Sequence, residues 1–392
     1  MGIEYFSDFL KEHASNCYFE IPLESFRGRR FALDINNLAF AMMGVAIKEV
    51  VEQTNLATEH PDRAEINRLA IDKIIGRLTV YLQYGITPVC VFDGKPHELK
   101  NHAKVKRKAN GDRIKGKLKE AETKLYSADQ LFRTQILVSD YAKYYKQNIE
   151  VSYDFMNQLR DLLFTVGFPV LLSADFGLET RDAEGICAAL CLQGNDYCVA
   201  TVSTDSDYHT YGGNIEITEI YPKYITTNGV RVTAYYAKVR SLEAILHQSG
   251  LTFDRFRDLC ILQGTDFNSN IPGVGVKRSW DYITRYGTIP QMIQCGIDVS
   301  VLNYENVLKI FASTVVRIDI PQPDFNAIRF RENGRKTFDI YGLRDHASSI
   351  ADHLNNFNTP VIMPSETPTA PPSGTSLLSD SNSQPVVSVI HF

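Results

Sequence analysis

Short apolar segments that each run into an aspartate alternate with helix-like segments through much of the chain. The apolar segments lie at residues 30–34, 87–93 and 197–207, and the last contains two aspartates, Asp205 and Asp207. Segments with helical periodicity, such as "EINRLAIDKIIGRLTVYLQYG", separate them. Strands that alternate with helices predict an α/β fold with a mostly parallel central sheet and helices on both of its faces.

The aspartates at the ends of these segments predict a site. The carboxyl ends of parallel strands meet at one edge of a sheet, so Asp34, Asp93, Asp205 and Asp207 should converge there. Each one alone is also typical of a polar turn, because Asp bonds to nearby backbone and ends strands. Four converging carboxylates would repel one another without a counter-cation. Residues i and i+2 of an extended segment also share a face that can hold a hard cation. The pattern therefore favours a divalent-metal site.

The composition excludes several classes of protein. The 392 residues are 44% hydrophobic, which allows a sizeable core in one large domain or two. The seven cysteines are scattered and form no C-x-x-C pair, which indicates neither a disulfide framework nor a zinc site and suits a reducing compartment. No apolar run reaches membrane-spanning length, and the acidic N-terminal stretch lacks the basic region of a signal peptide, so we expect no membrane partner.

Charge is unevenly distributed along the chain. The net charge of −5 argues against nucleic-acid binding, but residues 95–119 carry ten basic side chains against Glu98 and Asp112. Such a run is either a solvated helical surface or a surface that faces an anionic partner such as a phosphate backbone, and the run alone favours neither. From residue 95 to about 149 the sequence is polar, helix-prone and interrupted at "ANG", which predicts a helical excursion from the core.

A helix, a glycine-containing loop and a second helix are predicted farther along the chain. The loop "GTDFNSNIPGVGVKR" places Gly273 and Gly275 before the second helix, with Lys277 and Arg278 behind them. It lacks the third glycine and the preceding strand of a dinucleotide-binding fingerprint. Glycines at a helix N-terminus instead let backbone N–H groups approach a phosphate.

Several of these motifs, in this order, resemble the flap endonuclease family of structure-specific 5′ nucleases, of the XPG/Rad2 type. They are "MGI", "ALDINNLAF", "VCVFDGKPHELK", "DAEGICAAL", "STDSDYHTYG" and "LCILQGTDFNSNIPGVGVKRSWDYI". The resemblance runs from Met1 to about Leu354 and implies two Mg²⁺ ions, with Mn²⁺ as a substitute. The implied metal ligands are Asp34, Asp93, Asp182, Glu184, Asp205, Asp207 and Asp266. The segment before Asp182 is longer than is usual in the family, which leaves Glu179 as an alternative ligand to Asp182.

The resemblance also implies roles for basic and aromatic side chains. The basic helical region would form an arch over the active site, with Lys100 and Arg107 as catalytic cations for the scissile phosphate. These two residues are seven apart, so on one continuous helix they share a face. The expected DNA contacts are Gly2, Phe40, Arg77, Lys104, Gly273, Gly275, Lys277 and Arg278. From sequence alone Phe40 reads as a core aromatic, and Lys104 reads equally well as part of a solvated helix face.

We expect one nuclease domain followed by a tail. The nuclease domain is expected at 1–355 and the disordered tail at 356–392. Within the domain we expect an N-terminal block at 1–94, a helical arch at about 95–149 and an internal block at 150–290. The internal block includes a helix–two-turn–helix DNA-binding module at about 255–290. The tail is rich in Pro, Ser and Thr. It has Gln384 and Phe392 but lacks the spacing and paired aromatics of the family's sliding-clamp peptide, so a clamp partner is left open.

The predicted function is a two-metal-dependent DNA nuclease that cuts 5′ flaps near the duplex junction and trims 5′ ends in replication and repair. Two metals can activate water and stabilise the leaving oxygen, so no nucleophilic side chain is needed. We expect a monomer that acts on branched or flapped duplex DNA in the nucleus or another intracellular site of DNA replication. The alternatives are a sister 5′ exonuclease, a junction or excision-repair endonuclease, and a protein that binds branched DNA without cutting it. Lost carboxylates would mark the last, and all seven are present.

Overall fold

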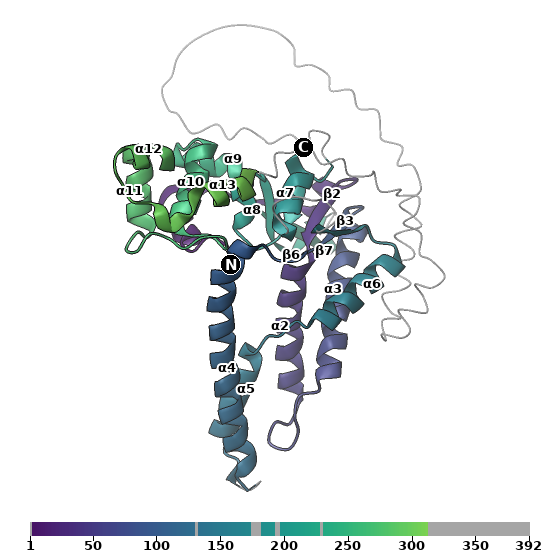
Figure 1. Ribbon diagram of the computed structural model, residues 1–392. Coiled ribbons are helices and arrows are strands. Elements are labelled where there is room, and N and C mark those ends of the chain that lie inside the picture. Colours follow the sequence, from purple (N-terminus) through teal and green to yellow (C-terminus); the bar gives the residue numbers. More distant parts are fainter. Residues whose placement is uncertain (1, 130–131, 174–181, 193–196, 228–229, 313–392) are drawn as a thin grey trace. The chain divides into compact units, whose positions relative to one another are not determined.

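The computed structural model describes residues 2–129, 132–173, 182–192, 197–227 and 230–312 (Figure 1). All of them belong to the first of the two units into which the chain divides, Met1–Asn358. The second unit, Thr359–Phe392, and the predicted tail lie outside the described residues.

The elements follow one another in an order that alternates strands and helices over the first two hundred residues. The described strands are β1 (Tyr18–Pro22), β2 (Arg30–Asp34), β3 (Thr87–Phe92), β4 (Val170–Leu172), β5 (Ala200–Val202), β6 (Ile215–Thr227) and β7 (Val230–Ser241). The described helices are α1 (Phe6–His13), α2 (Ile35–Gln53), α3 (Arg63–Gln83), α4 (Asn101–Ser127), α5 (Gln135–Gln147), α6 (Tyr153–Val166), α7 (Ala183–Leu192), α8 (Asp207–Thr210), α9 (Leu242–Ser249), α10 (Phe253–Gln263), α11 (Val276–Tyr286), α12 (Ile289–Gln294) and α13 (Tyr304–Ala312). Short 3₁₀ helices are η1 (Leu23–Phe26), η2 (Glu98–Lys100) and η5 (Ser300–Leu302).

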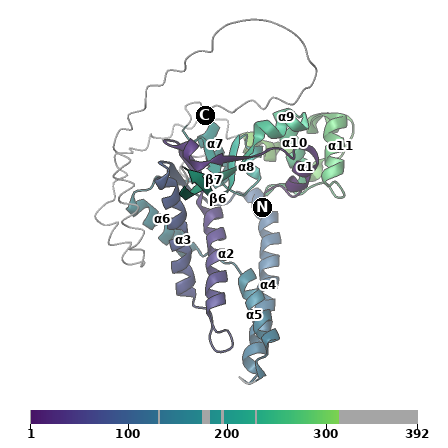
Figure 2. The same cartoon turned by 180° about the vertical axis from the view of Figure 1, so that it is seen from behind.

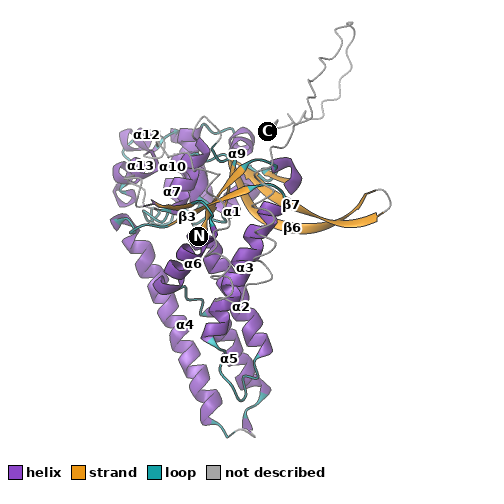
Figure 3. Ribbon diagram, turned by 90° about the vertical axis from the view of Figure 1, so that its right-hand side faces the viewer, coloured by secondary structure: helices purple, strands orange, loops and turns teal. Residues whose placement is uncertain are grey.

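The described strands form one seven-stranded sheet in the order β1-β7-β6-β5-β2-β3-β4. Neighbours from β6 to β4 pair in parallel, whereas β6–β7 and β7–β1 are antiparallel. The predicted mostly parallel α/β sheet is therefore confirmed. The long β6–β7 hairpin, which extends from the sheet in Figure 3, is absent from the sequence predictions. The Asn-Gly pair at 228–229 was the signal for it, because that pair is typical of a tight hairpin turn.

Alternating side chains along β2 and β3 build a core on each face of the sheet. Phe31, Leu33 and Cys90 belong to the cluster that contains α2 and α3, whereas Ala32 and Val89 pack with α7 in another cluster. Successive side chains of a strand point to opposite faces, so the two clusters lie on the two sides of the sheet. Both faces are thus covered by helices, and the central parallel strands end at one edge.

The helices α4 and α5 project from the sheet on the same side as α2 and α3 (Figures 1 and 2). α4 is continuous, so the predicted interruption at "ANG" is wrong. A helical glycine costs only about 1 kcal/mol relative to alanine, and the Lys-, Arg- and Glu-rich neighbours of Gly111 and Gly116 are good helix formers. At the far end of α4, Tyr126 Oη donates to the carbonyls of Leu56 and Glu59, each at 2.9 Å. α4 is therefore held at its far end by the connection between α2 and α3.

The helices α1 and α9 to α13 share a second hydrophobic cluster. Phe6 and Phe9 of α1 pack on Phe256 of α10, with each pair of ring centroids 6.2 Å apart. His13 stacks on Trp280 of α11 at a centroid distance of 3.7 Å. These contacts fix the N-terminal helix against the two helices that flank the glycine loop. In the part of the chain that the structure describes, no helix combines the length and apolar character needed to cross a membrane.

Candidate active site

The aspartates at the ends of β2 and β3 also organise the helices that follow. Asp34 accepts a hydrogen bond from Asn37 N at 2.9 Å and so caps α2. Asp93 accepts one from Ala183 N at 2.8 Å. This second bond joins the end of β3 to the first turn of α7, where the next two predicted ligands lie.

The seven predicted ligands come from five parts of the chain, of which the ends of β2 and β3 are two. Asp182 and Glu184 flank the start of α7, Asp205 and Asp207 lie between β5 and α8, and Asp266 follows α10. Five of the seven are almost fully buried, with exposed fractions of 2% for Asp34, 4% for Asp182, 7% for Asp205, 3% for Asp207 and 7% for Asp266. Buried carboxylates require compensation by hydrogen bonds or positive charge.

Mutual repulsion links these side chains into one cluster, which we call the carboxylate cluster. Burial, and then the charge of Asp93, raise the pKa of Asp34 to about 8. Burial also raises the pKa of Glu184 well above its usual value; Lys100 opposes this rise, and the charge of Asp34 adds to it. The pKa of Asp207 rises for the same reason, with contributions from Asp205 and Asp266. The strand ends therefore concentrate more negative charge than the site neutralises.

Two basic side chains from the start of α4 reach into the carboxylate cluster. Lys100 Nζ lies 2.8 Å from Asp182 Oδ2 and 3.7 Å from Asp266 Oδ2, and its side chain is only 13% exposed. Arg107 Nη2 pairs with the same Asp266 Oδ2. Burial alone would lower the pKa of Lys100, but Glu184, Asp182 and Asp266 outweigh it and raise that pKa. Lys100 is the last residue of η2 and the N-cap of α4, which we call the arm helix, and Arg107 lies in α4 itself, so both side chains reach Asp266 from the first turns of the arm helix.

The donor set suits hard divalent cations. All seven side chains offer the oxygen atoms that Mg²⁺ prefers, and among the described residues no group donates a hydrogen bond to buried Asp207 Oδ1. Across the described ranges, no three His, Cys, Asp or Glu side chains are already arranged to enclose an ion, and Asp182 and Asp266 are paired with basic side chains instead. The cluster fits Mg²⁺ in charge and donor chemistry, and ion binding requires these ion pairs to open.

The N-terminal segment packs directly against the carboxylate cluster. Ile3 N donates to Ser206 Oγ at 2.9 Å. A Cβ added to Gly2 would lie only 2.2 Å from Asp205 Oδ1, and the Gly2 φ of +57° is in the left-handed region that favours glycine. Glycine is therefore required at position 2 for the chain to approach Asp205 this closely.

Two protein-family models match the segments of the chain that carry the carboxylate cluster and the first turns of α4. The family model described as the XPG N-terminal domain matches residues 1–114, and the XPG I-region model matches residues 180–266. Together the matched segments make up just over half of the chain, and they contain all seven carboxylates together with Lys100 and Arg107. The chain belongs to the XPG/Rad2 family of structure-specific nucleases.

The XPG-family relatives are distant. Flap endonuclease 1 of Leishmania braziliensis is 28% identical over 298 residues, which cover 75% of this chain and 67% of that protein. Flap endonuclease 1-A of Oryza sativa subsp. japonica is 27% identical over 335 residues, which cover 83% and 79%. The solved catalytic core of Rad2 in complex with DNA substrate has a TM-score of 0.55 at 19% identity and covers 90% of this chain and 100% of that chain. Flap endonuclease-1 from Methanococcus jannaschii has a TM-score of 0.51 at 18% identity, with 86% and 96% covered. These structural matches show the XPG-family fold.

Three further residues that were predicted to contact DNA lie on the helices α2, α3 and α4 of this XPG-family chain. Phe40 follows Asp34 by six residues on α2 and is 51% exposed, so the reading as a core aromatic is wrong. Lys104 is exposed on α4. Arg77 of α3 is half-buried and donates to the Ile220 carbonyl of β6 at 2.8 Å. The DNA contact of Arg77 stays a prediction.

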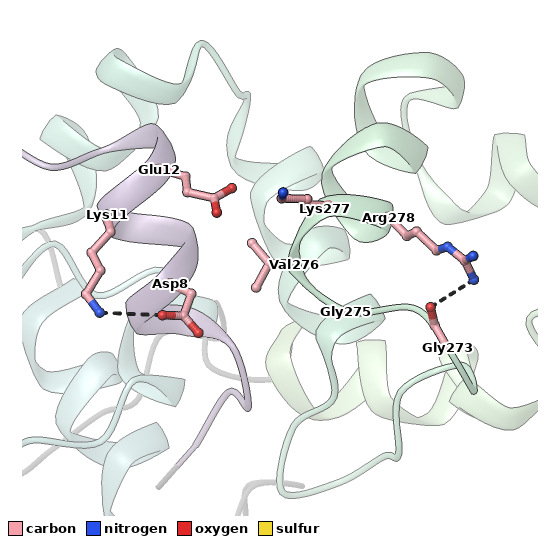
Figure 4. A pocket seen from close by; sticks show the side chains of 8 residues that line it. All are labelled: Asp8, Lys11, Glu12, Gly273, Gly275, Val276, Lys277 and Arg278. Atoms are coloured by element: carbon pink, nitrogen blue, oxygen red, sulfur yellow. Dashed lines mark hydrogen bonds and ion pairs between the residues drawn. The ribbon is translucent and has the colours of Figure 1, made fainter.

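The predicted glycine loop lines a hollow opposite α1 (Figure 4). Gly273 has a φ of +76°, and its carbonyl accepts a hydrogen bond from Arg278 Nη1 at 3.1 Å. Gly275 caps α11, and a Cβ added there would meet only Tyr5 Cζ at 3.9 Å. Lys277 and Arg278 are both exposed. The hollow thus exposes the α11 N-terminus with Lys277 and Arg278, and Lys11, Asp8 and Glu12 of α1 line it from the other side.

Several residues at the site were not predicted. Ser206 anchors the N-terminal segment, and Asp8 and Glu12 of α1 line the hollow beside Lys277 (Figure 4). The Ile3–Ser206 contact spans 203 positions, so no local pattern signals it. The alternative ligand Glu179 lies outside the described residues.

Proposed function

We propose that this chain is a Mg²⁺-dependent DNA nuclease that cuts 5′ flaps near the junction with duplex DNA and also removes nucleotides from 5′ ends. The observation that carries the proposal is the meeting of the carboxylate cluster with Lys100 and Arg107 of the arm helix. This arrangement offers oxygen ligands for ions and positive charge for a phosphodiester in one place.

We assign the carboxylate cluster to two ions, with Mn²⁺ as a substitute for Mg²⁺. When bound, such ions activate a water and stabilise the departing oxygen, so the reaction needs no nucleophilic side chain. Asp182 and Asp266 would be free to hold an ion only once Lys100 and Arg107 leave their oxygens. The released ammonium and guanidinium groups then bind the scissile phosphate and oppose its growing charge.

In this proposal α4 and α5 act as a helical arch at the active site. A cavity of about 550 Å³ lies between the N-terminal segment, α4 and the loop after α10, and Arg107 and Asp266 line it. Its volume lies in the range of about 300–1,000 Å³ that is typical of small-ligand sites. We infer that it admits nucleotides adjacent to the scissile phosphate, with Lys104 as a backbone contact.

The proposed duplex contact is the helix–loop–helix of α10 and α11. The N-terminus of α11 at Gly275, together with Lys277 and Arg278, offers N–H groups and positive charge to a phosphate backbone. Exposed Phe40 offers a ring on which a base at the junction can stack. We place the activity in DNA replication and repair, in the nucleus or another intracellular site of replication, and propose that the protein acts as a monomer.

Cleavage of labelled flap, nicked, single-stranded and four-way-junction DNA with Mg²⁺ tests the proposal. We expect the flap to be cut fastest near its junction, and Asp34→Ala and Asp205→Ala each to abolish cleavage while DNA affinity is largely kept. Carboxylates hold the ions in this proposal, whereas basic surfaces hold the DNA.

Other outcomes separate the alternatives. Preference for four-way junctions would favour a resolving enzyme, and preference for recessed or free 5′ ends would favour an exonuclease. Tight binding without cutting would favour a branched-DNA-binding protein. Full turnover in excess chelator would refute the metal-dependent mechanism.

A further inference from the structure

A buried group of three charged or titratable side chains lies behind the carboxylate cluster. It consists of His209 on α8, Glu216 on β6 and Arg240 on β7, and we call it the buried triad. Arg240 Nε donates to Glu216 Oε2 at 2.8 Å, and Arg240 Nη2 donates to the same oxygen. His209 Nε2 lies 3.0 Å from Glu216 Oε2 and 3.2 Å from Arg240 Nε. One carboxylate oxygen thus joins three separate elements.

The triad is buried too deeply to serve as a surface ion pair. The side chains of His209 and Glu216 are each 0% exposed, and that of Arg240 is 8% exposed. Glu216 and Arg240 are directly opposite each other in the β6–β7 ladder, which fixes their separation before any helix packs on them. The sheet therefore presents a preformed carboxylate–guanidinium pair to the histidine of α8.

This histidine lies on the element that carries a predicted metal ligand. α8 has only four residues and begins with Asp207, and a helix of that length has no stability of its own. Tyr208 and Thr210 of α8 are fully buried and pack with α7 and α10, and His209 adds two polar contacts. Nδ1–H donates to the Gly213 carbonyl at 2.9 Å, because a carbonyl can only accept, and Nε2 meets the sheet pair. His209 thus links the orientation of α8 to the β6–β7 pair.

The loop after α8 has no space in which to adjust. A Cβ on Gly213 would lie 2.2 Å from Cζ of the buried Tyr208 ring, so that ring packs directly on the Gly213 backbone. A shift of His209 therefore moves the whole turn from Asp207 to Gly213. Since Asp205 is two residues before Asp207, the same shift reaches both carboxylates.

We propose that the triad of His209, Glu216 and Arg240 is a positioning network that holds Asp205 and Asp207 in the geometry required for metal binding. This inference rests on the proposed function, which assigns the two aspartates to metal ions. Loss of groups that orient metal ligands typically lowers metal affinity by about 10–100-fold. The triad contacts no ligand carboxylate itself, so we expect an effect near the lower end, about tenfold.

Three substitutions of His209 test which of its contacts matters. His209→Leu removes both polar contacts, His209→Gln places an amide where Nε2 meets Glu216 and Arg240, and His209→Asn places one where Nδ1 meets Gly213. Mn²⁺ binding to the full chain is measured directly by electron paramagnetic resonance, without DNA or turnover. The half-saturating Mg²⁺ concentration for single-turnover cleavage is measured in parallel. We expect His209→Leu and His209→Asn to weaken Mn²⁺ binding about tenfold and His209→Gln to restore most of it.

Asp258→Asn is the matched control for loss of stability. Asp258 is also a buried carboxylate, 1% exposed, but it accepts from Ile289 N at 2.8 Å and Tyr304 Oη at 3.0 Å, which are in α12 and α13. We expect this variant to lower the melting temperature while leaving Mn²⁺ affinity unchanged.

Each result decides between positioning and structural support. Equal Mn²⁺ affinity in wild type and His209→Leu would overturn the inference. It would also be overturned if His209→Asn but not His209→Gln restored Mn²⁺ affinity, because the contact with the Gly213 carbonyl, and not the one with Glu216 and Arg240, would then be the one that matters. A drop in Mn²⁺ affinity in Asp258→Asn that matched its loss of stability would also overturn it. If wild type bound no Mn²⁺ at all, the proposed function itself would fail, which is a distinguishable result.

Discussion

The substitution Lys100→Ala is expected to have opposite effects on ion binding and on cleavage. Lys100 Nζ lies 2.8 Å from Asp182 Oδ2 and 3.7 Å from Asp266 Oδ2. A metal ion at these oxygens must displace the ammonium group. Once displaced, Lys100 is close enough to bind the scissile phosphate. The side chain therefore opposes metal binding in the free protein and favours the reaction in the complex.

Both magnitudes follow from this geometry. Removal of a placed electrostatic donor lowers the saturated rate by about a hundredfold or more. In water, a unit charge about 4 Å from a divalent ion is repelled by about 2 kcal/mol. The flexible lysine side chain relieves part of this by moving away, so Lys100→Ala should tighten metal binding by about tenfold, which corresponds to about 1.4 kcal/mol.

Two assays on matched variants measure these effects. Mn²⁺ binding by electron paramagnetic resonance reports ion affinity in the free protein, and single-turnover cleavage of saturating flap DNA reports the rate. Lys119→Ala is the control, since Lys119 is exposed on the same helix and should only weaken DNA binding slightly. Arg107→Ala should also slow cleavage, and Arg107→Lys should recover part of the rate, because a point charge cannot reproduce the planar fork of arginine. Equal small effects from Lys100, Arg107 and Lys119 would reduce α4 to a nonspecific basic surface.

Three further predictions test the loop, the arm helix and the buried triad. Gly275→Val should weaken duplex binding without lowering the melting temperature, because a Cβ there meets only Tyr5 Cζ at 3.9 Å; unchanged affinity with lost turnover would contradict the phosphate assignment. Gly111→Ala should stabilise α4 by about 0.5–1 kcal/mol, since a Cβ there meets nothing within 4 Å. Hydrogen exchange of the α4 amides should then be slower, and unchanged exchange would indicate that the helix is not folded in the free protein. Burial would raise the pKa of Glu216, but Arg240 and His209 hold that pKa below its usual value of 4.5. The ionised Glu216 therefore stabilises the folded protein fully above pH 4.5, and this stabilisation is lost as the pH falls through the lower pKa of the folded state. The difference in melting temperature between wild type and Glu216→Gln should therefore shrink on acidification below about pH 4.5, and a constant difference would contradict this.

The sequence by itself determined the strands and the place where the acids meet. Apolar runs that end in Asp34 and Asp93 form parallel strands, and parallel strands of one sheet end at one edge whatever their side chains are. The seven-residue spacing of Lys100 and Arg107 likewise predicted that the two side chains lie on one side of a helix, because helical periodicity is local, and in the structure both side chains reach Asp266. These features depend on residues close together in sequence, which is why the pattern alone was sufficient.

The tertiary structure decided which groups are paired, buried or exposed. Lys100 pairs with Asp182, and Arg107 with Asp266, across 82 and 159 positions, and sequence spacing says nothing about contacts between such distant segments. The sequence did not predict the buried triad for the same reason, because His209 meets Arg240 across 31 positions only once β6 and β7 have formed a hairpin. Phe40 is exposed for a related reason: an aromatic side chain is buried only where another element packs over it, and α2 leaves that position uncovered.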